Sequence, residues 1–322
     1  MPTSPSDMLI KNREQAHKGL LDRDTVVTDV EKNLTPWLDL IQDLVNYGTN
    51  LVVRCITTSD KKTKDKIVLS VLLRQAVAML DSVEVQLSKG CLHTAHLQMR
   101  ALFEASVYID WILSSDAEKK ARYYLVHNLR RKRLWASRMQ SGSPEAASFA
   151  KDTNRFKFDI SPEAEQKAKQ DIASIDQILA HPDLAPINAN FDTAKKARKY
   201  DVSWHEPFGL RSFAAVARAT GQSALYVFLY SSASEVMHSS NEDQHVEVTG
   251  GKVRLKAIRS LEHFDHVFRF SVSVALQLYR RILEEYRPGE FTKFSRKYVE
   301  EWQKQYLNFL KVNYSTTEMI SL

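Results

Sequence analysis

The sequence predicts an all-α fold, a multi-helix bundle with one small β-hairpin inserted in it. Glycine and proline, which interrupt helices, number only nine each among 322 residues, so long uninterrupted helices are expected. Apolar residues recur every three or four positions along much of the chain, as on one face of an amphipathic helix. Strict alternation of polar and apolar residues, which is typical of a strand, occurs only between His245 and Lys256.

The N-terminal part of the chain is expected to form four helices after a polar, unpatterned start of about 24 residues. Pro36 stands near the start of the first helix, where proline is tolerated, and Gly90 follows the second, where glycine is common. The third helix is apolar on both sides of its polar residues, which indicates a central position in the bundle. The expected spans are Asp29–Ile56, Ile67–Leu87, His93–Leu113 and Ala117–Met139.

The C-terminal part is expected to add five helices and the hairpin. Residues 183–211 contain proline, asparagine and glycine, so we expect an irregular segment that crosses the domain. Gly250 and Gly251 form the predicted turn of the hairpin. The expected helices span Ser161–Ala180, Ser212–Thr220, Gln222–His238, Ile258–Tyr286 and Phe294–Val312.

We expect the chain to divide into three parts. The last helix carries an aromatic stripe, which is typical of a core face or of a helix-docking face and would also suit a homodimer contact. Its residues are Tyr298, Trp302, Tyr306 and Phe309. The three parts are an N-terminal tail and helix (1–66), a helical core domain with the hairpin near 246–256 (67–286), and the C-terminal aromatic helix (287–322).

Composition and the absence of known motifs argue against several classes of protein. Two cysteines cannot make a disulfide framework, so a reducing compartment is the default. The N-terminus lacks the apolar region of a signal peptide, and no apolar run is long enough for a membrane span, so we expect a cytoplasmic protein. No phosphate-binding loop, dinucleotide-binding glycine motif, nucleophile elbow or zinc-protease motif is present. No cofactor is therefore expected.

Positive charge is concentrated in one helix. The net charge is +6, and the segment Asp116–Arg138 holds eight Lys or Arg against two acids. Such a segment attracts polyanions such as RNA, although a solvated helix face has the same composition. A second basic cluster spans Lys195–Lys199.

The third helix carries four polar residues on one face. His93, His96, Arg100 and Glu104 stand three or four positions apart, with apolar residues around them. One interpretation is an i,i+4 ion pair between Arg100 and Glu104 at the edge of the core. The other is a functional site, since a desolvated guanidinium and carboxylate need specific partners.

A second group of polar residues lies near the end of a later helix. Tyr230, Ser234 and His238 follow one another at intervals of four. The helix dipole favours the charged form of a histidine at this end, so His238 could donate a proton or bind a phosphate, with Ser234 steering its ring. It could also be a simple cap. Glu235 and His238 have the spacing of a di-metal bundle motif, but no second such pair lies on a core helix, so no metal site is predicted.

In order and spacing, these elements resemble an uncharacterised bacterial family, a domain of unknown function, that pairs an R-x-x-x-E helix with a later S-x-x-x-H helix. The resemblance covers about Ile67–Tyr286. The matching residues are Arg100, Glu104, Trp204, Gly221, Tyr226, Tyr230, Ser234 and His238, followed by the Gly250-Gly251 hairpin.

That family is distantly similar to HEPN domains (higher eukaryotes and prokaryotes nucleotide-binding), many of which are metal-independent ribonucleases of toxin or antiviral systems. The usual HEPN motif places arginine and histidine on one helix, four to six residues apart. Here the nearest arginine before His238 is Arg218, so the arginine and histidine would have to come together from different helices, using Arg100.

The resemblance implies an RNA-directed protein of a defence or toxin-like system, with Arg100, Glu104 and His238 as catalytic residues of a metal-independent endoribonuclease. Substrate-binding residues would be His96, Trp204, Tyr230, Ser234, Arg130, Arg131 and Arg133. The alternative is a non-enzymatic helical module that binds a small anionic ligand, a protein partner or a second copy of the chain. A third interpretation makes Arg100, Glu104 and His238 a buried structural network.

Overall fold

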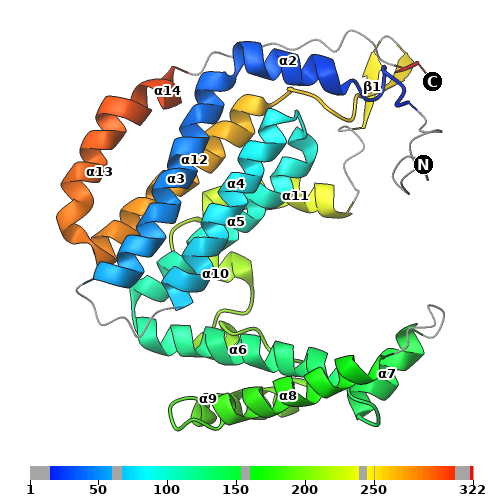
Figure 1. Cartoon of the computed structure of the whole chain (residues 1–322), viewed down its shortest axis with the longest axis vertical. Coiled ribbons are helices and arrows are strands. Elements are labelled where there is room, and N and C mark those ends of the chain that lie inside the picture. Colours follow the sequence, from blue (N-terminus) through cyan, green and yellow to red (C-terminus); the bar gives the residue numbers. More distant parts are fainter. Residues whose placement is uncertain are drawn as a thin grey trace, which may run out of the picture. The chain divides into compact units, whose positions relative to one another are not determined.

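The computed structural model describes residues 15–59, 67–153, 160–238, 245–249, 251–308 and 320–321. It consists of helices and one small antiparallel sheet, which confirms the expected fold class (Figure 1). Contacts gather in two compact units. Unit 1 takes its described residues from 1–63, 69–110 and 223–322, and unit 2 from 64–68 and 111–222. The three-part division expected from the sequence stays a prediction.

The first expected helix is two helices in the structure. α2 (Arg23–Asn33) begins after Asp22, whose carboxylate accepts a hydrogen bond from the Thr25 amide at 3.1 Å. α3 (Thr35–Thr58) begins directly after Leu34. Pro36 causes the break, because it has no amide hydrogen and its ring clashes with the carbonyl four residues earlier. The expectation of one helix over Asp29–Ile56 was therefore wrong.

The core of unit 1 is built from α3, α4 (Arg74–Ser88) and α12 (Phe264–Tyr286), which pack against one another. A π-helical segment, Val68–Leu73, leads into α4, so the second expected helix is continuous. Gly48 lets Tyr279 approach α3 closely: a Cβ atom at Gly48 would lie 2.2 Å from the tyrosine oxygen. That hydroxyl donates to the Leu44 carbonyl at 2.9 Å.

The α12 helix begins later than expected. His263, with φ of 65°, precedes it, and residues 256–263 are not helical. The backbone amides of Ile258 and Ser260 donate to the carbonyls of Leu20 and Gly90, at 2.8 and 3.0 Å. Residues 256–263 thus lead into α12 as a non-helical segment bonded to these two carbonyls, and the helix expected from Ile258 starts only at Phe264.

The C-terminal aromatic stripe lies on a helical run of three segments. α13 (Phe291–Lys297), a π segment (Tyr298–Trp302) and α14 (Gln303–Leu307) form one helical run. Trp302 is 1% exposed, meets the Tyr47 ring edge-on at 5.4 Å, and its Nε1 donates to Asp43 at 2.6 Å. The stripe thus includes a core residue, whereas Phe309 lies outside the described residues.

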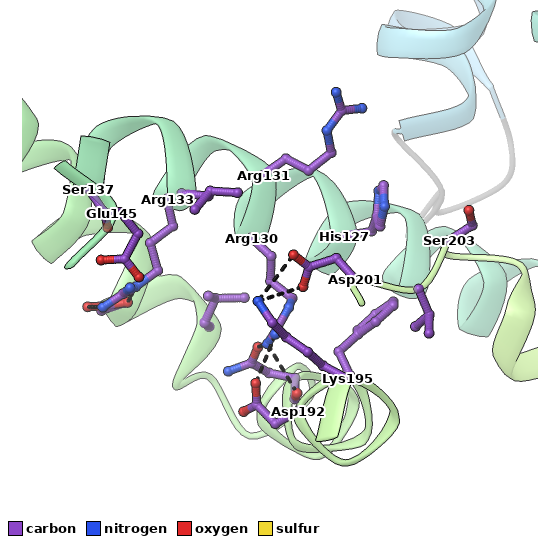
Figure 2. A pocket seen from close by; sticks show the side chains of 16 residues that line it. His127, Arg130, Arg131, Arg133, Ser137, Glu145, Asp192, Lys195, Asp201 and Ser203 are labelled. Carbon is purple, nitrogen blue, oxygen red and sulfur yellow. Dashed lines mark hydrogen bonds and ion pairs between the residues drawn. The ribbon is translucent and has the colours of Figure 1, made fainter. Parts of the chain in front are cut away.

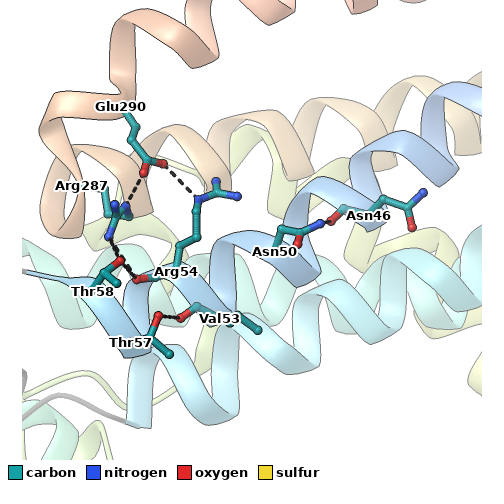
Figure 3. A network of polar contacts seen from close by, with 8 residues as sticks. All are labelled: Asn46, Asn50, Val53, Arg54, Thr57, Thr58, Arg287 and Glu290. Atoms are coloured by element: carbon teal, nitrogen blue, oxygen red, sulfur yellow. Dashed lines mark hydrogen bonds and ion pairs between the residues drawn. The ribbon is translucent and has the colours of Figure 1, made fainter.

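Arg287 secures the C-terminal end of α3 (Figure 3). Its Nη1 donates to the Arg54 carbonyl at 3.1 Å and to the Thr58 hydroxyl at 2.6 Å. The Glu290 carboxylate accepts from Nε of both arginines, at 2.6 Å from Arg287 and 3.2 Å from Arg54. Because the Arg54 carbonyl also accepts from the Thr58 hydroxyl at 2.9 Å, Arg287 adds a charged donor to a group already bonded within α3.

The predicted hairpin is confirmed. β1 (Val246–Thr249) pairs antiparallel with β2 (Lys252–Leu255), and Thr249 faces Lys252 across the turn. Gly251 has φ of 75°, which glycine adopts without strain. A third short strand, β3 (Ile320–Ser321), pairs with β2 and was not expected.

Unit 2 is built around α6 (Ala117–Arg138), which packs against its neighbours α7 (Pro144–Thr153), α8 (Pro162–Leu179) and α9 (Ala185–Arg198). α7 was not expected. The expectation of an irregular segment over 183–211 was wrong where α9 lies. Only Ile187 and Phe191 of α9 are buried, so its apolar periodicity is too sparse to read from the sequence.

The remaining elements agree with expectation. α5 (Leu92–Ser114) begins in unit 1, and its residues from Trp111 onward belong to unit 2. A 3-10 turn (Glu206–Phe208) and α10 (Phe213–Ala219) follow in unit 2, and α11 (Ser223–His238) returns to unit 1. Over the described parts of the chain, none of the helices has the length and apolar character needed to span a bilayer.

Candidate functional site

The predicted ion pair on α5 is present. Nε of Arg100 donates to Oε1 of Glu104 at 2.9 Å, and the two side chains are 14% and 32% exposed. Their neighbours Met99, Leu102 and Phe103 are fully or almost fully buried. The pair therefore lies where the core of unit 1 meets solvent, with the guanidinium more desolvated than the carboxylate. Its role as a site stays a prediction.

Four histidines of unit 1 meet in two ring pairs near the start of α5. His96 stacks on His266 of α12 with ring centroids 6.2 Å apart, and His93 meets His245 edge-on at 4.9 Å. Burial lowers the pKa of His93, His96 and His266. Nδ1 of His96 lies 3.0 Å from the Leu92 carbonyl, which suits a neutral ring that donates to the backbone. His96 is thus held by contacts within the fold.

The second predicted constellation lies on α11. This helix is described as far as His238 and belongs to the same unit as Arg100 and Glu104. The side chains of Tyr230, Ser234 and His238 lie outside the described residues. A meeting of His238 with Arg100 therefore stays a prediction.

Unit 2 contains a cavity of about 630 Å3 between α6, α8, α9 and the segment after α9 (Figure 2). Three of the predicted substrate-binding residues, Arg130, Arg131 and Arg133, border it, as does Lys195 of the second basic cluster. The structure thus brings together two basic segments that are far apart in the sequence. Four acids also border the cavity: Glu145, Asp176, Asp192 and Asp201.

Most cations of the cavity are already paired. Arg130 lies 2.8 Å from Asp192 and donates to the Asn188 side-chain oxygen at 2.6 Å. Arg133 binds Asp176 through two nitrogens, at 2.6 and 3.0 Å. Lys195 lies 3.0 Å from Asp201. These pairs cancel much of the positive charge on which the polyanion hypothesis rests, and they join α6 to α8 and α9.

Arg131 differs from its neighbours. It is exposed and has no ion pair with any residue that the structure describes. Although it borders the cavity, Figure 2 shows its guanidinium directed away from Arg130, Asp192 and Lys195. Of the three predicted arginines, Arg131 is the one that a large anion can reach without breaking an ion pair.

His127 forms part of the cavity wall and was not predicted. Burial, and then the nearby Arg131, His205 and Arg130 side chains, lower the pKa of His127 from 6.5 to about 4, against the opposite effect of Asp201. The imidazole is therefore neutral at neutral pH. Sequence reasoning missed it because Phe191, Asp201 and His205, which also surround it, come from α9 and the segment after it, which was expected to be irregular.

Trp204, another predicted substrate-binding residue, is a core residue of unit 2. It is 4% exposed, and its ring packs on Trp111 at 4.9 Å and Tyr124 at 5.1 Å. The buried Lys120 nearby donates to the Trp111 carbonyl at 2.6 Å and to the hydroxyls of Ser114 and Ser115. Trp204 thus contributes to the core of unit 2, and its role in substrate binding stays a prediction.

A family model described as a family of unknown function (DUF5677) matches residues 66–252, which is more than half of the chain. No curated protein and no solved structure matches the chain.

Proposed function

The chain belongs to this family of unknown function, and we propose that it is an RNA-directed protein of a bacterial defence or toxin-like system, acting as a metal-independent endoribonuclease. The proposal keeps the distant HEPN similarity as its basis and makes Arg100, Glu104 and His238 the catalytic residues. It also keeps a cytoplasmic location and a homodimer or protein partner as expectations.

The ion pair on α5 is the observation that supports this proposal best. Glu104 holds Nε of Arg100 and so fixes the plane of a guanidinium that is 14% exposed at the margin of the core. A guanidinium oriented in this way suits a phosphate, because its geometry matches two oxygens and its charge is stronger in a partly desolvated place. α11, whose last described residue is His238, lies in the same unit.

The proposed reaction is internal transesterification of RNA. The 2′ oxygen attacks the neighbouring phosphorus as its proton passes to water, and the bond from phosphorus to the 5′ oxygen breaks. His238 gives its proton to the departing 5′ oxygen, since the C-terminal end of a helix favours the charged imidazolium. Arg100 stabilises the charge that grows on the phosphate oxygens. The products are a 2′,3′-cyclic phosphate and a 5′-hydroxyl.

The test is incubation of purified wild type and His238→Ala with total RNA in EDTA, followed by gel electrophoresis. Fragmentation by the wild type alone supports the proposal. Equal circular dichroism spectra show that the variant keeps its fold. Intact RNA with both proteins contradicts the proposed activity.

The cavity of unit 2 favours a second candidate, a module that binds a small anionic ligand. Its volume of about 630 Å3 suits a small molecule. Arg130, Arg133 and Lys195 could exchange their carboxylates for an anionic group. A rise in melting temperature with inorganic phosphate or nucleotides, lost in Arg130→Ala, would favour this candidate over RNA cleavage.

A further inference from the structure

One face of α6 carries two arginines and a tryptophan, of which Arg131 and Trp135 are exposed and Arg138 is half-buried. Arg131, Trp135 and Arg138 follow one another at i, i+4 and i+7, so they share this face. Arg131 is exposed, and Trp135 is 52% exposed although it is among the largest apolar side chains. Tryptophan left half open to water needs an explanation beyond packing.

The indole of Trp135 is held in place from one side. The guanidinium carbon of Arg138 lies 4.4 Å from the centroid of the Trp135 ring, and Phe149 of α7 meets the same ring edge-on at 6.3 Å. These contacts fix the side chain while half of its surface stays open. A ring that is ordered before binding loses less conformational entropy when a ligand stacks on it.

The charge of this face differs from that of the cavity. Arg130 and Arg133 point to the cavity side of α6 and are bound to Asp192 and Asp176. In the described part of the chain, neither Arg131 nor Arg138 forms an ion pair, and the exposed Lys132 beside them forms none either. The face therefore keeps its positive charge, which the cavity does not.

We infer that Arg131, Trp135 and Arg138 form a binding stripe for single-stranded RNA, an inference that rests on the proposed function. Guanidinium groups bind phosphate oxygens, and an open indole offers a surface on which a base can stack. Bases in a duplex are stacked on one another and cannot reach a flat side chain, so the stripe selects unpaired strands.

The other occupant that such a stripe could take is an acidic protein surface, because exposed tryptophan and arginine are enriched at protein interfaces. The two occupants differ in what they need from position 135. A protein surface needs apolar area, which leucine also supplies, whereas a base needs an aromatic face. The pair Trp135→Leu and Trp135→Phe therefore separates them.

The test is fluorescence anisotropy of a labelled single strand of 2′-O-methyl RNA titrated with the full chain. The blocked 2′ oxygen prevents the proposed cleavage during the titration. We expect Trp135→Leu to bind about 5- to 100-fold more weakly and Trp135→Phe to keep most of the affinity, as stacking on one base predicts. Arg131→Ala should lower the slope of affinity against salt by about one charge.

Lys167→Ala is the matched control, since Lys167 is an exposed lysine of α8 in the same unit, and it should bind as the wild type does. Equal binding by wild type and Trp135→Leu would overturn the stripe and leave the RNA-directed function standing. A wild type that cleaves RNA but does not bind this strand would also overturn the stripe alone. A wild type that neither binds nor cleaves RNA would overturn both.

Discussion

Arg130 and Arg131 are neighbours on α6, yet one is bound inside unit 2 and the other faces solvent. Nη2 of Arg130 lies 2.8 Å from Oδ1 of Asp192, whereas Arg131 has no ion pair among the described residues. The basic segment is therefore two sets of residues. One set fastens α6 to the helices beside it, and the other keeps its charge for a partner.

Substitution of these two arginines should show that Arg130 stabilises the fold and that Arg131 does not. Arg130→Met removes the cation from Asp192 and the donor from the Asn188 oxygen and should lower the free energy of unfolding by about 1–2 kcal/mol. Arg131→Met should change it by less than about 0.5 kcal/mol, since no contact is lost. Urea denaturation of both variants measures their free energies of unfolding. Equal losses in the two variants would contradict the division of the basic segment into a structural set and an exposed set.

Lys120 is a second stabilising cation of the basic segment. It is 4% exposed and donates to the Trp111 carbonyl and to two serine hydroxyls at the end of α5. Lys120→Met keeps the length of the side chain but removes the charged donor of these three bonds, so we expect a loss of roughly 1–3 kcal/mol. Lys119→Met, at an exposed neighbouring position, is the control. An unchanged unfolding midpoint for Lys120→Met would show that this network contributes nothing.

The contact between Gly48 and Tyr279 predicts a clash that a second substitution relieves. In Gly48→Ala the new Cβ would lie 2.2 Å from the tyrosine oxygen and 2.8 Å from Val77, so we expect a loss of about 1–3 kcal/mol. Tyr279→Phe removes the oxygen atom. The double variant should therefore lose less than the sum of the two single losses, as a double-mutant cycle measures. Additive losses would mean that the two residues do not touch as described.

His127 predicts a dependence of stability on pH. Because its pKa in the folded protein is about 4, below the ordinary 6.5, the folded state takes up the proton less readily than the unfolded state. Its contribution is fully present above about pH 6.5 and is lost as the pH falls toward about 4.

The matched variant isolates this effect from the other histidines. Between about pH 7 and about pH 5, the wild type should lose roughly 1–2 kcal/mol more than His127→Gln, after allowance for partial exposure. Urea denaturation at both pH values gives the two losses. Equal losses in the two proteins would show that His127 titrates normally in the fold.

The sequence predicted most helices because their apolar positions repeat over many turns, as on α5 and α12. Boundaries that depend on contacts between distant segments were not predictable. The segment before α12 is non-helical and its Ser260 amide binds the carbonyl of Gly90, a contact that no pattern near Ile258 indicates. α9 escaped prediction because only Ile187 and Phe191 mark its buried face.

For the candidate sites, as for the helices, contacts within one helix were predictable from the sequence and contacts between distant segments were not. The Arg100–Glu104 pair follows from spacing along one helix, which local geometry fixes. The partners of Arg130 and Arg133 lie on α9 and α8, so only the fold could show that these arginines are already in ion pairs. The open face of Trp135 likewise depends on which side of α6 the neighbouring helices cover.

The chemistry of the RNA ends tests the central proposal most directly. Purified wild type, Arg100→Ala and His238→Ala are incubated with RNA in EDTA, and new 5′ ends are labelled with polynucleotide kinase, with and without prior phosphatase treatment. The account predicts new 5′-hydroxyl ends, labelled equally well without phosphatase, in the wild type alone. An absence of new ends with the wild type, or equal cleavage by His238→Ala, would contradict it.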